Sequence, residues 1–403
     1  AQLAAFPILL YRFYSVSLFS LPLNLLFIPF ISLFVLPLVA IGFFASLFVP
    51  FIGGPLLAVL AFVVRLAHGC LLEIDSWPLG MLVFGKPSLW FVFLLYGVIF
   101  YGFVVWETGG PKKRLAKPVF LFIAVCLFQW YSPYLSGSGE VTMLDVGQGD
   151  SILIELPHRR AVYLIDTGGQ IAFDKESWQT QKHTFKVGRD VVLHELKARG
   201  IRAIDKLILT HGDEDHTGGA KALLGNIRIG QILFGKGPVS ETTAKQLLAH
   251  ARLLGIPIVR VEEGMAWRAG KTTFSVLNPA EAGDENNRSI VIAARLGGLK
   301  WLFVGDLEEE GEQRLIQDYR NLDIDVLKVG HHGSKTSTTK AFLAETTPRA
   351  ALISVGENNM YGHPSPVVIQ RLKAFGVKVL RTDQNGAIRF EYDGEERTFT
   401  WVK

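Results

Sequence analysis

The sequence predicts an α-helical transmembrane segment followed by an α/β domain built from layers of sheets and helices. Only seven of the 41 lysines and arginines and three of the 37 aspartates and glutamates precede Tyr134, so the first third of the 403-residue chain is nearly free of charge. After residue 140, short apolar segments alternate with amphipathic ones, which is typical of layered α/β packing. We assign the transmembrane helices to residues 1–135 and the second domain to residues 136–403.

Four apolar runs in the first third are candidate membrane spans, because about 20 apolar residues cross a bilayer. They cover residues 25–50, 51–67, 89–106 and 118–131. The last run is short enough to be either a tilted span or an interfacial helix. Prolines and glycines interrupt the first two runs, and such helices either pack against their neighbours or line a translocation path.

The charges in the loops predict an orientation. The loop between the third and fourth runs holds four cations, Lys112, Lys113, Arg114 and Lys117. The positive-inside rule places this loop in the cytoplasm and the more acidic loop 68–88 outside. If the fourth run crosses the membrane, the second domain lies on the extracytoplasmic side.

The composition limits the possible functions. A net charge of +4 is too small to argue for nucleic-acid binding, so any electrostatic binding surface must be local. Both cysteines, Cys70 and Cys126, lie in the apolar third, which excludes a cysteine-based metal site from the second domain. The chain begins at Ala1 directly in an apolar region, and we interpret it as a fragment of a longer protein.

Apolar segments bounded by turn residues predict the elements of the second domain. Strands are expected at residues 141–146, 151–155, 161–165, 206–209, 300–304, 325–329, 350–355 and 377–381. Helices are expected at residues 191–199, 308–319, 340–345 and 367–375.

The strongest chemical signal is the segment THGDEDHTGG at residues 210–219, directly after a buried strand. Four potential ligands occupy it: His211, Asp213, Asp215 and His216. Side chains this dense on one loop cannot all pair with each other, so one or two cations would satisfy them. A solvated acidic turn is the alternative, but the glycines on both sides favour a tight, preformed loop.

Further polar residues follow apolar strands in the same way. They are Asp306, the pair His331 and His332, and His363. A turn would explain any one of them. Because the ends of strands in layered α/β folds meet at one edge, these residues and the 210–219 segment are expected to line one site.

The motifs resemble those of a known superfamily. HxDxDH at residues 211–216, after DTG at 166–168 and before GD at 305–306, looks like the motif series of the metallo-β-lactamase superfamily, with Asp213 where a second histidine is more common. The whole set is similar to the ComEC family of competence DNA-uptake proteins: DVGQGDS (145–151), HGDEDH (211–216), NNRSIVI (286–292), HHGSKTS (331–337) and YGHPSP (361–366).

The resemblance implies a four-layer αββα metallo-β-lactamase-like fold and two divalent metal ions. One ion would be held by His211, Asp213 and Asp306, and the other by Asp215, His216 and Asp306. One or both of His331 and His363 would complete the ligand sets, with His331 favoured as the direct ligand of the histidine pair. The family pattern has a histidine in its third motif that is absent here, where Asn286, Asn287 and Ser289 stand instead.

Other residues would support these ligands or contact the substrate. Asp166, Asn287 and His332 would hold the ligands from behind through hydrogen bonds. Asp215, Ser334 and Lys335 are the candidate catalytic residues, and Lys335 would contact phosphate unless it is a solvated turn residue. Because Asp213 replaces a histidine with an oxygen ligand, Mn²⁺ is favoured, with Mg²⁺ or Zn²⁺ as alternatives.

The resemblance also implies a function. The chain would be a membrane-bound channel protein for DNA uptake in natural transformation, whose second domain is a metal-dependent nuclease or phosphodiesterase. Its partners would be DNA, the membrane and other proteins of the competence machinery. The alternatives are a metallo-hydrolase of small molecules such as esters or lactams, and a non-catalytic DNA-binding or structural domain on a transporter.

Overall fold

The computed structural model describes residues 2–75, 80–109, 111–169, 185–278, 283–357 and 359–402. Residues 76–79 of the loop expected outside the membrane are not among them. The chain forms two compact units: Ala1–Trp130 with Lys197–Gly200, and Tyr131–Leu196 with Ile201–Lys403. The boundary expected at residue 135 coincides with the end of a helix, α6 (Ala116–Leu135).

The first unit is mostly helical. In chain order it contains α1 (Gln2–Phe13), β1 (Ser15–Ser17), α2 (Ser20–Pro29), the π-helix η1 (Phe30–Val35), α3 (Leu36–Phe48), α4 (Pro50–Asp75), β2 (Met81–Val83), α5 (Leu89–Glu107), the short 3-10 helix η2 (Lys112–Leu115) and α6.

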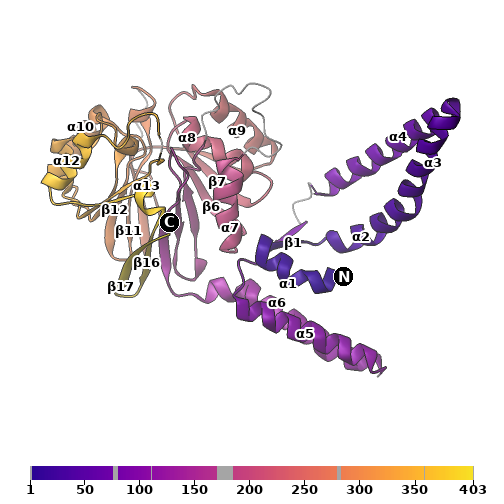
Figure 1. The fold of residues 1–403 in the computed structure, drawn as a ribbon. Helices are drawn as coiled ribbons and strands as arrows, with labels where there is room; N and C mark the ends of the chain where they lie inside the picture. The colour runs from indigo at the N-terminus through magenta and orange to yellow at the C-terminus, as the bar shows by residue number, and fades with distance from the viewer. Residues whose placement is uncertain are drawn as a thin grey trace. The chain divides into compact units, whose positions relative to one another are not determined.

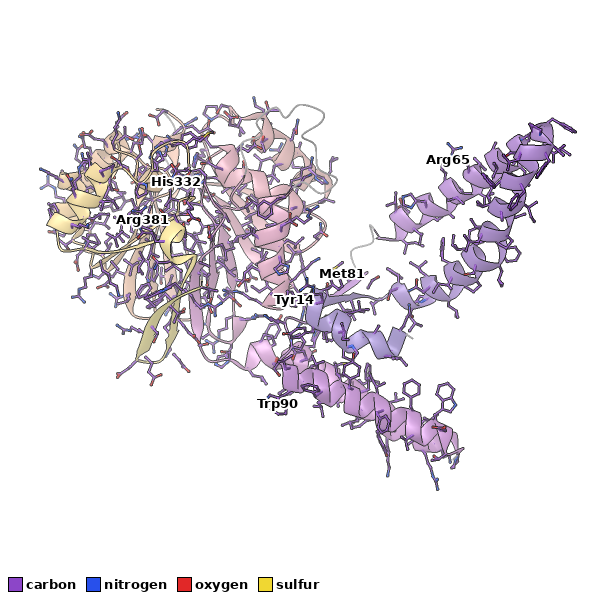
Figure 2. All side chains as sticks on the ribbon, viewed as in Figure 1. Tyr14, Arg65, Met81, Trp90, His332 and Arg381 are labelled. Carbon is purple, nitrogen blue, oxygen red and sulfur yellow. The ribbon has the colours of Figure 1, made fainter. Side chains whose placement is uncertain are left out.

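Four helical segments in the described residues are long and apolar enough to cross a membrane: Ser20–Phe48, Pro50–Ile74, Leu89–Glu107 and Lys113–Leu135. They correspond to the four apolar runs of the sequence. Between 6% and 17% of the residues in these spans are buried inside the protein, and Trp90 on α5 is an example of the outward-facing remainder (Figure 2). Such a continuous apolar surface needs an apolar solvent, as expected of membrane helices.

The proline- and glycine-rich part of this unit has two structural consequences. The first span winds locally as the π-helix η1 between α2 and α3, a distortion that is uncommon in uninterrupted helices. The helices α3 and α4 approach backbone to backbone at Gly53, where a Cβ atom would lie 2.1 Å from the backbone nitrogen of Ser46. Only glycine permits this contact, and small residues at such crossings are typical of membrane helix pairs.

The second unit contains two β-sheets that face each other (Figure 1). The eight-stranded sheet has the order β17 (Glu396–Val402), β16 (Ala387–Asp393), β3 (Gly139–Met143), β4 (Ile152–Glu155), β5 (Val162–Ile165), β6 (Ala203–Leu209), β7 (Arg228–Gly235) and β8 (Ile258–Val261). The seven-stranded sheet has the order β15 (Lys378–Arg381), β14 (Ala350–Ile353), β13 (Val326–Lys328), β12 (Leu299–Phe303), β11 (Val291–Leu296), β10 (Thr272–Asn278) and β9 (Ala266–Ala269).

Helices cover the outer face of each sheet. The helices α7 (His194–Ala198) and α9 (Thr242–Leu253) pack on the eight-stranded sheet, and α10 (Glu309–Asp318), α11 (Lys340–Thr346) and α12 (Pro366–Ala374) pack on the seven-stranded sheet. Strands such as β14, with the sequence AALI, are buried on both faces and so consist of apolar residues only. Three apolar cores result: one between the sheets, and one under each helical layer.

This arrangement confirms the predicted αββα fold. The parallel strands β5–β8 of one sheet and β12–β15 of the other place several loops at the carboxyl ends of strands. Shorter elements occupy these loops and the remaining connections: η3 (Pro157–Arg159), η5 (Gly188–Leu193), α8 (Glu214–Thr217), η6 (Gly218–Ala222), η7 (Asn286–Arg288), η8 (Gly330–Gly333) and α13 (Thr382–Asn385).

Candidate metal centre

The loops after three strands, β6, β12 and β13, bring predicted site residues together. His211 follows β6 and His216 lies on α8, the next element of the eight-stranded half. Asp306 follows β12, and His332 lies on η8 after β13, both in the seven-stranded half. Ligands that are 121 positions apart in the chain thus meet because both sheets end at the same edge.

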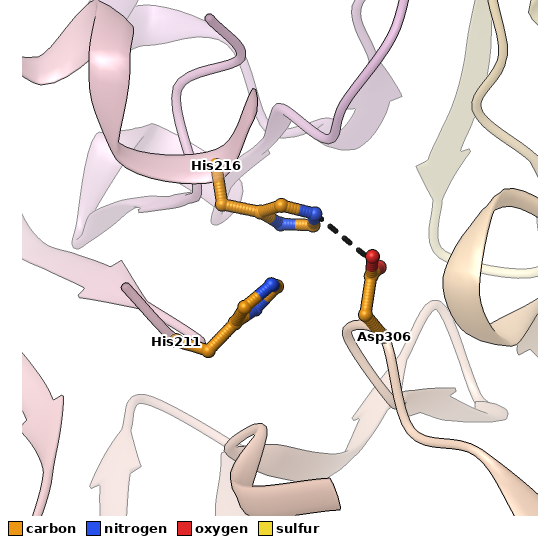
Figure 3. Close-up of side chains that lie close together, drawn as sticks. All are labelled: His211, His216 and Asp306. Carbon is orange, nitrogen blue, oxygen red and sulfur yellow. Dashed lines mark ion pairs between the residues drawn. The ribbon is translucent and has the colours of Figure 1, made fainter. Parts of the chain in front are cut away.

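Four of these side chains form a buried set that we call the inner group: His211, His216, His332 and Asp306. Their exposed fractions are 4%, 0%, 0% and 3%. The Nε2 atom of His216 lies 3.3 Å from one oxygen of Asp306, and the Nε2 atom of His332 lies 3.3 Å from the other. Figure 3 shows His211, His216 and Asp306 converging on one point.

The inner group fits a metal ion. Among the residues that the structure describes, the buried Nε2 atoms of His211, His216 and His332 and the Oδ1 atom of Asp306 have no hydrogen-bond partner. Buried polar atoms without partners are costly, and four that face each other are rare. Imidazole nitrogens and a carboxylate oxygen are ligands of divalent cations, so cations bound among these residues would satisfy the four atoms.

Asp215 lies at the edge of the inner group. Its Oδ2 atom is 3.4 Å from the Nε2 atom of His332, and the side chain is 18% exposed. Asp215, His216 and His332 together offer three ligand atoms within 4.8 Å of one another. Asp306 faces both this trio and His211, so it is placed to bridge two cations, as the sequence predicted for a bridging carboxylate.

Asp166 holds the loop that carries His211 and His216. Its carboxylate accepts hydrogen bonds from the Thr210 backbone N–H at 2.8 Å and the Thr210 hydroxyl at 2.6 Å. It also lies 2.8 Å from the Nδ1 atom of His216, so an Nδ1–H there would donate to it and leave Nε2 free to bind metal. Asp166 therefore stands behind the ligands, in the supporting position predicted for it.

The two adjacent histidines have exchanged the positions we expected. His332 is buried in the inner group, and its Nδ1 atom lies 3.0 Å from the carbonyl oxygen of Ser354. His331 is 26% exposed and its Nε2 atom is 3.9 Å from Asp306, while its Nδ1 atom lies 2.8 Å from Glu308. The geometry therefore favours His332 as the direct ligand and His331 as its neighbour at the mouth of the site.

Three predicted ligands, which we call the outer group, lie away from the inner four: Asp213, His331 and His363. The Oδ2 atom of Asp213 is 3.5 Å from the Nε2 atom of His211, but the side chain is 37% exposed and clusters with Glu241 and Glu285 instead of Asp306. The ring of His363 lies 5.6 Å from that of His331 and stacks on Tyr361.

The candidate catalytic residues Ser334 and Lys335 directly follow the histidine pair. The hydroxyl of Ser334 is buried and lies 2.8 Å from that of Thr336. Lys335 is exposed on this loop, a few residues from His332 in the chain. Both are therefore near the site in sequence, and the structure gives neither a contact with the inner group.

The segment that replaces the family's third-motif histidine has structural roles. Asn287 is buried, and its side-chain oxygen accepts hydrogen bonds from the backbone N–H groups of Glu308 and Gly311, at the start of α10. The hydroxyl of Ser289 accepts a hydrogen bond from the Asp306 backbone N–H at 3.1 Å and lies 3.4 Å from the Nδ1 atom of His211. Both residues thus fix the loop of Asp306 and offer no metal ligand comparable to a histidine.

Comparison with known families agrees with this site. The model of the metallo-β-lactamase superfamily matches residues 144–357, more than half of the chain and all of the inner group. The chain belongs to the metallo-β-lactamase superfamily. A second model, that of competence proteins, matches residues 1–109. Together with the four apolar helices, this second match marks the chain as a membrane protein.

One curated relative matches nearly the whole chain, and two others match about two thirds of it. The chain is 37% identical over 415 residues to ComE operon protein 3 of Bacillus subtilis, covering 99% of this chain and 52% of that protein. It is 35% identical over 253 residues to Competence protein ComA of Neisseria gonorrhoeae (62% and 32%), and 30% identical over 276 residues to Recombination protein 2 of Haemophilus influenzae (68% and 31%). The chain thus spans about half the length of these relatives or less, and the resemblance to the competence DNA-uptake family is confirmed.

The electrostatics of the metallo-β-lactamase site depend on its carboxylates. Burial alone would lower the pKa values of His216 and His332, but the carboxylates around them, above all Asp306, raise both well above the usual range. Burial would likewise raise the pKa of Asp306, yet the two imidazoles hold it well below the usual range. A cation that enters the site must therefore displace protons from these histidines.

Three residues of the metallo-β-lactamase site were missed by the sequence analysis: Asp150, Glu308 and Lys328. Asp150 was assigned only to a turn, and Lys328 only to a strand. Both are buried at the back of the inner group, and Glu308 holds His331. A charged residue inside the otherwise apolar strand segment VLKV was the available signal, since lysine is almost never fully buried unless it is paired.

Three non-glycine residues of the site have left-handed backbone conformations. The φ angles are 55° for Asp166, 44° for His331 and 51° for His332. L-residues rarely adopt this region because the Cβ atom approaches the backbone, and such strain gathers at functional sites. The loops of the metallo-β-lactamase site are thus held in conformations that favour ligand placement over local backbone energy.

Proposed function

We propose that the second unit is a metal-dependent nuclease, a phosphodiesterase that cleaves incoming DNA, in a membrane-bound protein that forms a DNA-uptake channel. One observation carries this proposal: among the described residues, four buried ligand atoms from both halves of the fold lie together and make no hydrogen bond. One relative is named Competence protein ComA, and residues 1–109 match the model of competence proteins, which supports DNA as the substrate. The chain covers 52% of the length of ComE operon protein 3 and 32% of that of Competence protein ComA, so the channel role is part of the proposal.

The residues divide into two ligand sets that share Asp306. His211, with Asp213 at its outer side, would hold one cation, and Asp215, His216 and His332 would hold the other. The absence of cysteine and the number of carboxylates favour Mn²⁺ or Mg²⁺ over Zn²⁺. Two such cations, when bound, supply a water nucleophile at neutral pH and stabilise the departing oxygen of a phosphodiester.

The remaining residues would act on the substrate. His331 has its Nδ1 atom held by the Glu308 carboxylate, which fixes the ring with Nε2 toward Asp306. It is partly exposed, so it can contact a phosphate group that enters the site. Lys335, on the exposed turn that follows, is placed to pair with a neighbouring phosphate of the same strand.

We also propose that this unit lies on the extracytoplasmic side of the membrane. Its partners would be DNA, the membrane and other competence proteins. The four cations of the loop between the third and fourth spans support this orientation. A cysteine introduced at exposed Lys335, in a chain that lacks Cys70 and Cys126, should react with a membrane-impermeant maleimide on intact cells. Protection until the cells are lysed would reverse the orientation.

The nuclease proposal is tested with the whole chain purified in detergent. Linear DNA should be degraded in Mn²⁺ and left intact in EDTA, and the Asp306→Asn variant should be inactive. Cleavage of a chromogenic lactam or ester in Zn²⁺ without cleavage of DNA would establish the small-molecule hydrolase instead. Binding of DNA that is equal in the native chain and the variant, without cleavage in either, would establish a non-catalytic domain.

A further inference from the structure

A buried ion pair lies behind the inner group and belongs to none of the predicted ligand sets. It joins Lys328, on the central strand β13, to Asp150, in the turn between β3 and β4. The exposed fractions are 1% for both residues. A lysine buried to this degree requires a reason, because removing an ammonium group from water is costly even when it is paired.

We propose that Asp150 and Lys328 are positioning residues that hold Asp306 and His332 in the geometry that receives metal. The inference concerns metal affinity, and it rests on the proposed function only in that the inner group binds divalent cations. It does not depend on which substrate the site cleaves.

Lys328 holds the Asp306 loop at two points. Its Nζ atom donates a hydrogen bond to the carbonyl oxygen of Gly305 at 2.9 Å and lies 3.6 Å from the Oδ1 atom of Asp306. Gly305 has a φ angle of 56°, so the chain reverses sharply at the residue before the ligand. The ammonium group therefore fixes both the turn and the carboxylate that would bridge two cations.

Asp150 lies behind His332. Its Oδ1 atom is 3.4 Å from the Nδ1 atom of His332, while the Nε2 atom on the opposite side of the ring faces Asp215 and Asp306. The other oxygen of Asp150 contacts the Lys328 ammonium group. Asp150 thus lies on the Nδ1 side of the ring, where its charge orients the ring together with the Ser354 carbonyl oxygen, 3.0 Å from Nδ1.

The pair also connects the two halves of the site. Asp150 comes from the eight-stranded sheet, where its backbone carbonyl accepts a hydrogen bond from the Gly168 N–H at 2.6 Å, next to the loop of Asp166. Lys328 comes from the seven-stranded sheet. The ion pair consequently links the loop of Asp166, which holds His216, to the segments that carry Asp306 and His332.

A positioning role and simple electrostatic repulsion predict opposite effects of removing Lys328 on metal affinity, which makes the proposal testable. An ammonium group 3.6 Å from Asp306 repels a divalent cation bound there, so its removal should strengthen metal binding if charge is all that matters. If Lys328 acts by positioning, its removal should weaken metal binding. The sign of the change in Mn²⁺ affinity separates the two.

The experiment uses the whole chain in detergent and four variants: Asp150→Asn, Lys328→Met, the double variant Asp150→Asn/Lys328→Met, and Leu372→Ala. Mn²⁺ affinity is measured by competition with a chelator, and thermal unfolding is measured without metal. Lys328→Met alone should unfold most easily, because it leaves Asp150 buried without its partner. The double variant removes both charges and should regain most of the native midpoint.

We expect the double variant to bind Mn²⁺ roughly tenfold to a hundredfold more weakly than the native chain, the usual range for partners behind a metal ligand. Leu372→Ala, in the core under α12, controls for instability: it should lower the unfolding midpoint and leave the affinity unchanged. Lys328→Met decides the sign, because it removes the ammonium group alone: measured below its unfolding midpoint, it should also bind Mn²⁺ more weakly than the native chain. Should Lys328→Met fail to fold, the double variant carries the test.

Several outcomes would overturn the proposal. These are native or tighter Mn²⁺ affinity in Lys328→Met or, where that variant does not fold, in the double variant; an equal loss of affinity in Leu372→Ala; and a native chain that retains no Mn²⁺. A native chain that binds Mn²⁺ but does not cleave DNA would contradict the nuclease proposal alone.

Discussion

The inner and outer groups of candidate ligands look alike in the sequence and differ in the structure. Both consist of histidines and aspartates that follow strands. The inner group is buried and its ligand atoms have no hydrogen-bond partner among the described residues, whereas the outer residues Asp213 and His331 are 37% and 26% exposed and His331 is held by Glu308. The comparison teaches that a buried ligand atom without a hydrogen-bond partner indicates a metal-binding position more clearly than the type of residue does.

The largest effect is expected from the inner carboxylate. Asp306→Asn removes the negative charge and one carboxylate oxygen from the residue that lies 3.3 Å from both His216 and His332, so metal binding and DNA cleavage should fall by at least roughly a hundredfold. Metal content after gel filtration and the rate of DNA cleavage measure the two effects. Asp213→Asn, in the outer group, is the matched control and should lose less of both; an equal loss would erase the distinction between the groups.

The histidine pair gives the next largest contrast. His332→Ala should lower the bound metal by one equivalent, because its Nε2 atom belongs to the inner group. His331→Ala should keep the metal and slow the cleavage of DNA. Elemental analysis of the two purified variants decides between them, and the reverse pattern would restore His331 as the ligand.

A smaller loss of metal affinity is expected when Asp166, which supports the ligands, is replaced. Asp166→Asn keeps the size of the side chain but weakens its hydrogen bonds to Thr210 and His216. We expect metal affinity to fall by roughly tenfold, with the stoichiometry unchanged. A chelator competition assay measures the affinity, and a change of stoichiometry would mean that Asp166 itself is a ligand.

The smallest expected effect is on the pH dependence of Mn²⁺ affinity. The pKa values of His216 and His332 are raised, so protons compete with metal at these residues below their pKa values. Mn²⁺ affinity should therefore increase with pH between about 6 and 8, about tenfold per pH unit for each proton displaced. Burial and the nearby imidazoles lower the pKa of His363 to about 4, so it is already neutral there. His363→Asn should keep the slope, and a flatter slope would mean that His363 also releases a proton when metal binds.

Much of the fold could be predicted from the sequence because the second unit repeats simple patterns. The strand VYLI at β5 is a short apolar run bounded by turn residues, and the helix EEGEQRLIQD at α10 has the helical period. Both were expected near their observed bounds. The strands β7–β11, β16 and β17 were not predicted. Several of these, such as β9 with the sequence AWRA, are short and half-exposed, so their pattern is weak without the neighbouring strands.

The site was predictable only as far as residue type and strand ends allow. HGDEDH and Asp306 were recognisable because strand ends gather at one edge. The choice between His331 and His332 could not be made, since it depends on two left-handed residues in succession that turn one ring inward. Lys328 was missed because strand periodicity alone cannot reveal that a lysine faces the interior and has an aspartate partner 178 positions earlier.

The left-handed backbone conformation at Asp166, His331 and His332 raises the local conformational energy, while the side chains at these positions serve the site. Glycine at any of these positions would relieve roughly 1 kcal/mol or more of conformational strain while deleting a side chain that the site uses. A selection for heat resistance alone should therefore accumulate glycines at these three positions and produce robust proteins without catalysis. Where such replacements occur in natural sequences, they would mark lineages that have kept the scaffold after giving up the chemistry.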